Sequence, residues 1–83
     1  MNQNDYYKNN FSTYDLGLAS ALVTAGYTVN HLDRSDSKKV QFIFNHEEQL
    51  DDVIQAYWAH KLKLSPLAYF NNVKMLKNRI YSN

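Results

Sequence analysis

The sequence of 83 residues contains no cysteine, one proline and two glycines. Without cysteine the chain forms neither a disulfide nor a thiolate metal site, which favours a cytoplasmic location. Residues 1–10 are polar and lack the apolar stretch of a signal peptide, and no apolar run approaches the length of a membrane span. Gly17 and Gly26 stand apart, so no glycine-rich phosphate loop is present. We therefore expect a cytoplasmic protein without a membrane partner.

The three histidines do not have the spacing of a metal site. His31, His46 and His60 lie 15 and 14 residues apart, whereas a helical zinc pair needs two histidines four residues apart on one face. We interpret them as ordinary surface histidines. The sequence predicts no metal and no cofactor.

Paired carboxylates are present, but their setting does not indicate catalysis. Glu47, Glu48, Asp51 and Asp52 fall where a helix is expected to begin, and anions there are favoured by the helix dipole. General acid and base groups instead lie in clefts that shift their pKa values. We expect these carboxylates to be solvated and the protein not to be an enzyme.

The chain is long enough for one domain and one hydrophobic core. Apolar residues make up 45% of it, close to the usual globular value. Residues 1–10 are rich in asparagine and have no periodicity, so we expect a flexible N-terminal tail followed by a single domain over residues 11–83. Tyr6, Tyr7 and Phe11 are candidates to hold part of the tail as a short edge strand.

The first predicted helix follows this tail. Ser12 or Thr13 is the expected N-cap, and Asp15 would lie in the first turn. Gly26 supplies the left-handed residue that ends a helix, with Tyr27 folding back over its last turn. The expected buried face consists of Leu18, Ala21, Leu22 and Ala25.

A hairpin is predicted next. Residues 28–32 read as a strand, and residues 33–37 form a polar turn cluster. Residues 39–45 alternate between the two faces of a strand, and Phe42 and Phe44 are expected in the core.

Two more helices complete the pattern. Asn45 and Glu48 have the spacing of a capping box for the first of them, whose apolar stripe would be Leu50, Val53, Ile54, Tyr57 and Trp58. Ser65 and Pro66 open the second as N-cap and first helical residue. Its predicted buried stripe is Leu67, Phe70, Val73, Leu76 and Ile80.

The predicted fold class is α+β. The expected order is (β)αββαα, with a small antiparallel sheet, made of the hairpin and a candidate N-terminal edge strand, packed by three helices.

Charge is divided unevenly along the chain. Residues 1–52 hold four basic and eight acidic side chains, whereas residues 53–83 hold five basic and no acidic ones. An acidic body with a basic C-terminal third predicts a contact with nucleic acid or with an acidic protein surface, although a solvated lysine face needs no ligand. The candidate contact residues are Lys61, Lys63, Asn71, Lys74, Lys77, Asn78, Arg79 and Tyr81.

Several segments together resemble a known family. They are residues 11–26, 39–44, 56–58, 64–70 and 77–81. The whole pattern resembles a family of small uncharacterised proteins of about 75–85 residues from bacteria, phages and mobile elements. The resemblance implies a small stand-alone accessory protein of mobile-element origin, and no particular activity.

Two functions remain open from the sequence. The first is a non-enzymatic interaction module, such as an adaptor, inhibitor or small subunit, that binds a protein partner or a second copy of itself. Its basis is small size and an aromatic content of 14%, because aromatic residues often anchor interfaces. The alternative is a nucleic-acid-binding accessory protein that uses the basic face of the C-terminal helix.

Overall fold

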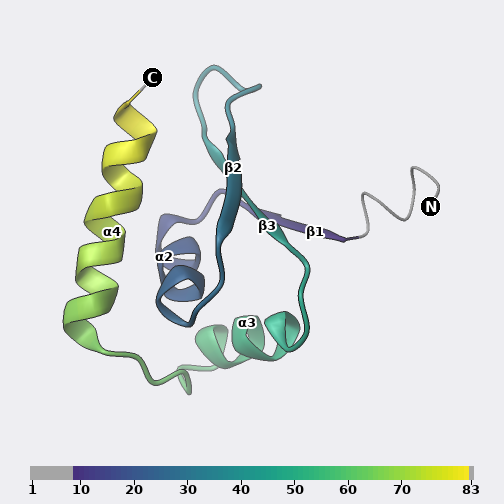
Figure 1. Cartoon of the computed structure of the whole chain (residues 1–83), viewed down its shortest axis with the longest axis vertical. Helices are drawn as coiled ribbons and strands as arrows, with labels where there is room; N and C mark the ends of the chain where they lie inside the picture. Colours follow the sequence, from purple (N-terminus) through teal and green to yellow (C-terminus); the bar gives the residue numbers. More distant parts are fainter. Residues whose placement is uncertain (1–8, 83) are drawn as a thin grey trace.

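Three strands and three helices make up the described part of the chain, which covers residues 9–82 of a computed structural model. The fold is α+β in the predicted order βαββαα (Figure 1). The expected flexible tail falls outside the described residues as far as Lys8, while its last residue, Asn10, already belongs to a strand. The elements are β1 (Asn10–Thr13), α2 (Leu16–Thr24), β2 (Val29–Asp33), β3 (Gln41–Asn45), α3 (Leu50–Trp58) and α4 (Pro66–Tyr81).

The sheet is antiparallel, with strand order β1-β3-β2. Phe44 of the central strand lies opposite Phe11 on one side and Val29 on the other, so the expected edge strand forms around Phe11. The predicted Tyr6 and Tyr7 contributions lie outside the described residues. Phe42 and Phe44 are 1% and 0% exposed, which confirms the two core aromatics.

Helix α2 lies between α4 and the sheet (Figure 1). Residues 18–22 are all buried, as expected for a helix that is covered on every side. The N-cap is Asp15, whose Oδ1 accepts a 2.8 Å hydrogen bond from the Leu18 N–H. The predicted caps Ser12 and Thr13 were wrong, because both residues pair with β3 as part of β1.

The end of α2 follows the sequence prediction at Gly26, but Ala25, which was expected on the buried face, is the exposed C-cap. Gly26 has a φ of 110°, in the left-handed region that glycine adopts without strain. Its N–H donates to the Val23 carbonyl at 3.0 Å, and the Tyr27 N–H donates to the Leu22 carbonyl at 3.0 Å. This pair of hydrogen bonds is a Schellman motif.

Helix α3 begins differently from the prediction. Gln49 occupies the N-cap with a φ of 68°, and its side chain makes no capping hydrogen bond. The predicted capping box of Asn45 and Glu48 was wrong, because Asn45 is the last residue of β3. Its side-chain oxygen instead accepts a 2.8 Å hydrogen bond from the Asn30 amide of β2.

One hydrophobic core joins the sheet to the three helices. The core is formed by Leu18, Ala19, Leu22, Val29, Phe42, Phe44, Leu50 and Leu76.

No helix between residues 9 and 82 combines the length and the apolar character that crossing a membrane would require.

Candidate interaction surface on helix α4

Helix α4 carries most of the residues that the sequence singled out. It starts as predicted, with the Ser65 hydroxyl accepting a 3.2 Å hydrogen bond from the Ala68 N–H and Pro66 in the first turn. Its basic residues are Lys74, Lys77 and Arg79, and the helix contains no acidic residue. The helix therefore presents positive charge without an intrahelical counterion.

Contacts with α2 set the rotation of α4 about its axis. The Tyr69 hydroxyl donates a 3.2 Å hydrogen bond to the Gly17 carbonyl, and the Asn72 amide donates to the Thr24 hydroxyl at 2.9 Å. Leu76, one turn further along, is fully buried. The side of α4 that bears Tyr69, Asn72 and Leu76 is thus fixed against α2.

This rotation corrects the predicted buried stripe. Leu76 belongs to the core, Ile80 packs against it and Val73 is half-buried, but Leu67 and Phe70 are 69% and 57% exposed. The prediction placed them in the core because their spacing also fits a helical period. The hydrogen bonds from Tyr69 and Asn72 turn the opposite side of the first two turns inward instead.

We call the solvent-exposed side of α4 the outer face. At 100° per residue its members fall on one arc of the helix. Lys74 lies over the ring of Phe70, with its Nζ 4.9 Å from the ring centroid, a cation–π distance. The outer face consists of Leu67, Phe70, Asn71, Lys74, Met75, Lys77, Asn78 and Tyr81, all exposed.

Five of the eight predicted contact residues lie on this outer face: Asn71, Lys74, Lys77, Asn78 and Tyr81. The other three do not belong to it.

Of those three, Arg79 is exposed beside the outer face, near the end of the helix. Lys61 and Lys63 are exposed in the connection between α3 and α4. The structure therefore divides the predicted basic surface into two parts.

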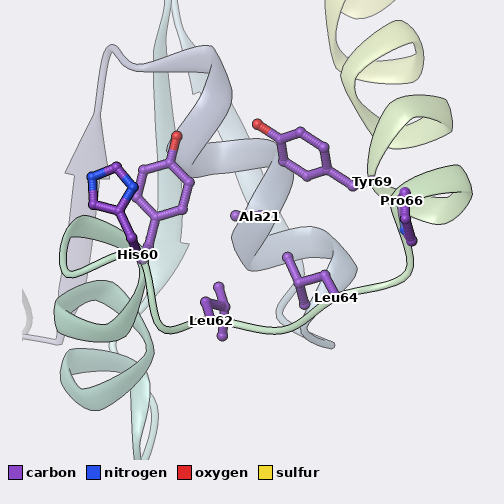
Figure 2. A pocket seen from close by; sticks show the side chains of 7 residues that line it. Ala21, His60, Leu62, Leu64, Pro66 and Tyr69 are labelled. Atoms are coloured by element: carbon purple, nitrogen blue, oxygen red, sulfur yellow. The ribbon is translucent and has the colours of Figure 1, made fainter.

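A cleft of about 430 Å³ lies on the other side of α4, between α2, α3 and the connection (Figure 2). Two tyrosine side chains enter it, Tyr57 from α3 and Tyr69 from α4. Burial raises the pKa of Tyr57 above its ordinary value of 10.0, and the neighbouring Tyr69 and Asp15 add to the shift. The lining residues are Ala21, Tyr57, His60, Leu62, Leu64, Pro66 and Tyr69.

Trp58 was expected in the buried stripe of its helix, but it is 56% exposed. Its ring packs edge-to-face against Tyr57, with centroids 5.0 Å apart. Trp58 is the last residue of α3.

Histidines and carboxylates are the side chains of this chain that could bind a metal ion. Within residues 9–82, no group of three or more potential ligand side chains is close enough to hold a metal ion. The nearest approach to a cluster is the exposed pair of His46 and Asp51, whose Nε2 and Oδ1 atoms lie 2.9 Å apart.

The comparison with known proteins identifies a family. Residues 8–82 match the model of a family described as "Domain of unknown function (DUF5659)", so the chain belongs to this family. The match covers nearly the whole chain and confirms the resemblance to a family without an assigned function. No curated protein and no solved structure matches the chain significantly.

Proposed function

We propose that this member of the family is a small, non-enzymatic accessory protein that binds a protein partner through the outer face of α4. The observation that carries the proposal is the exposure of Leu67 and Phe70 on the same helix face as Lys74 and Lys77. Tyr81, 79% exposed, extends this face to the end of the helix. Apolar groups grouped on an exposed face are typical of interaction sites.

The spacing of these side chains suits recognition of a helix by a groove. Leu67, Phe70 and Lys74 occupy positions i, i+3 and i+7, the pattern by which a helix places its anchor residues in an apolar groove. Aromatic residues supply much of the binding energy in such interfaces. Because α4 has basic but no acidic residues, the fitting partner is an apolar groove bordered by carboxylates.

The non-enzymatic part of the proposal is supported by the placement of the carboxylates. Glu47, Glu48, Asp51 and Asp52 are all exposed. Catalytic acids and bases instead work in clefts, where their pKa values are shifted.

Quantitative capture from a host extract tests the proposal. The immobilised protein is compared with the Leu67→Ser/Phe70→Ser variant and with Trp58→Ser, a control that removes an exposed aromatic residue outside α4. We expect the double variant to capture at least about tenfold less of a specific protein partner than the wild type does, because anchor residues each contribute more than about 1 kcal/mol to binding. Equal capture by the double variant and the wild type would refute the role of the outer face.

A second copy of the chain is one candidate partner. The exposed acidic residues around the start of α3 complement the basic outer face of α4. Sedimentation velocity at low and high salt distinguishes this case, since self-association through charge weakens as salt rises.

Nucleic acid is the second candidate ligand of the outer face. Lys74 and Lys77 lie beside Asn71 and Asn78, and the exposed rings of Phe70 and Tyr81 are available for stacking on bases. Fluorescence anisotropy with labelled single-stranded DNA, duplex DNA and RNA measures this directly. Binding that persists at physiological salt and disappears in Lys74→Glu/Lys77→Glu would favour nucleic acid over a protein partner.

A further inference from the structure

The connection between α3 and α4 has features of an unpaired strand. It begins where α3 ends in a Schellman motif, with the Lys61 N–H donating to the Ala56 carbonyl at 2.9 Å and the His60 N–H to the Tyr57 carbonyl at 3.2 Å. His60 takes the left-handed conformation that this motif requires, with a φ of 62°. From there the chain crosses to α4 without helical or strand structure (Figure 1).

Exposure alternates along this connection with a period of two. Leu62 and Leu64 are half-buried, whereas Lys61, Lys63 and Ser65 are exposed. A period of two is the side-chain pattern of an extended chain with one covered face. The two leucines line the cleft, and the two lysines do not.

The backbone of the connection is available for pairing. Among residues 9–82, no backbone–backbone hydrogen bond involves the N–H or C=O groups of Leu62, Lys63 or Leu64. Backbone groups without an internal partner are satisfied by water or by another chain. An exposed, unpaired extended segment is a template on which another chain can add a strand.

The cleft beside this segment has the character of a side-chain pocket. Figure 2 shows Leu62 and Leu64 along the connection, with Ala21 of α2 behind them. The hydroxyl groups of Tyr57 and Tyr69 add polar atoms to a mainly apolar lining. A strand added alongside the connection would direct alternate side chains toward the same cleft as Leu62 and Leu64.

We propose that the connection over residues 61–65 binds an extended, acidic peptide segment of a partner protein by strand addition. The peptide pairs with the free backbone of Leu62, Lys63 and Leu64. One of its apolar side chains occupies the cleft, and its carboxylates lie near Lys61 and Lys63, whose charge sets the choice of an acidic peptide. This site lies apart from the outer face of α4, so the two proposals succeed or fail separately.

Display selection with a random 12-residue peptide library tests the site without assuming a sequence. The expected outcome is enrichment of peptides in which acidic residues alternate with apolar ones, and one apolar position should dominate an alanine scan of the peptide. Enrichment of no peptide, or of basic peptides, would overturn the proposal.

The selected peptides, labelled with fluorescein, are then titrated against three proteins: the wild type, Lys61→Glu/Lys63→Glu, and the matched control Lys74→Glu/Lys77→Glu. We expect the Kd to rise at least about tenfold for the first variant only, because reversed charges beside the peptide repel its carboxylates. An equal loss in both variants would indicate attraction by net charge alone and would contradict a site in the connection.

Hydrogen exchange tests the backbone pairing itself. Amide exchange at Lys63 or Leu64 is expected to slow at least about tenfold when the peptide binds, since a strand hydrogen bond protects the donor. Unchanged exchange at Leu62, Lys63 and Leu64 in the saturated complex would exclude strand addition.

Discussion

The guanidinium of Arg34 donates a 2.6 Å hydrogen bond to the carbonyl of Arg79, which joins the β2–β3 loop to the end of α4. The same side chain donates to the carbonyls of Ile80 at 2.8 Å and Ser82 at 3.0 Å. The last carbonyls of a helix lack partners within the helix, and the negative end of the helix dipole attracts a cation. Arg34 thus caps the end of α4, although it lies more than 40 positions earlier in the chain than the carbonyls that it binds.

Replacing Arg34 with alanine should loosen this end of the helix. We expect the free energy of unfolding in urea to fall by about 1 kcal/mol, because charged hydrogen bonds are lost at an exposed site. Amide exchange in the last turn of α4 should also become faster. Lys38→Ala in the same loop is the control, since the Lys38 side chain makes no contact of this kind within the described residues. An Arg34→Ala protein with unchanged exchange in the last turn would show that the cap does not stabilise α4.

Gly17 and Tyr57 should be coupled energetically. A Cβ atom at position 17 would lie 2.8 Å from the Tyr57 hydroxyl oxygen, closer than van der Waals contact allows. Gly17→Ala should therefore lower the free energy of unfolding by about 1 kcal/mol in the wild type. In a Tyr57→Phe background the hydroxyl is gone, and the same change should be neutral or raise stability by up to about 1 kcal/mol through helix propensity.

A double-mutant cycle measured by urea unfolding gives this coupling directly. Equal effects of Gly17→Ala in both backgrounds would contradict the close approach of the two residues.

The shifted pKa of Tyr57 makes stability depend on alkaline pH. Because burial raises its pKa above 10.0 in the folded state, the unfolded chain loses this proton first as the pH rises. The contribution of protonated Tyr57 to the free energy of unfolding is complete below pH 10.0. It is lost as the pH rises from there through the folded-state pKa of Tyr57. Unfolding curves measured between pH 8 and 11 (about the range that brackets tyrosine ionisation) should show a steeper alkaline loss for the wild type than for Tyr57→Phe. Parallel curves for the two proteins would contradict the burial of this hydroxyl.

Two leucines of α4 should respond oppositely to truncation. Leu76 is 0% exposed, so Leu76→Ala should lower the free energy of unfolding by about 2–5 kcal/mol. Leu67 is 69% exposed, so Leu67→Ala should change it by no more than about 0.5 kcal/mol. Similar losses at both positions in urea unfolding would mean that Leu67 is buried, as the sequence pattern predicted, and would remove it from the outer face.

Local signals predicted much of the fold. The alternation around Phe42 and Phe44 indicated the central strand, Gly26 indicated the end of α2, and Ser65 with Pro66 indicated the start of α4. Each of these signals depends on the geometry of a few neighbouring residues.

Contacts between distant residues explain what the sequence could not predict. The rotation of α4 depends on hydrogen bonds from Tyr69 to Gly17 and from Asn72 to Thr24, which span 52 and 48 residues. A helical period in the sequence fits more than one rotation, so it could not choose between Leu67 and Tyr69 as the residue that faces α2. All five basic candidate contact residues are exposed, but the apolar part of the outer face was missed for this reason.

Photo-cross-linking from the outer face of α4 tests the central claim most directly. The photoreactive residue p-benzoylphenylalanine replaces Phe70 in one protein and Gln55, an exposed residue of α3, in a control. After irradiation in host cells, the account predicts that position 70 cross-links to one defined protein, that position 55 does not, and that Leu67→Ser/Lys74→Glu abolishes the product. Cross-links to nucleic acid, equal products from both positions, or no product from position 70 would contradict binding of a protein partner through this face.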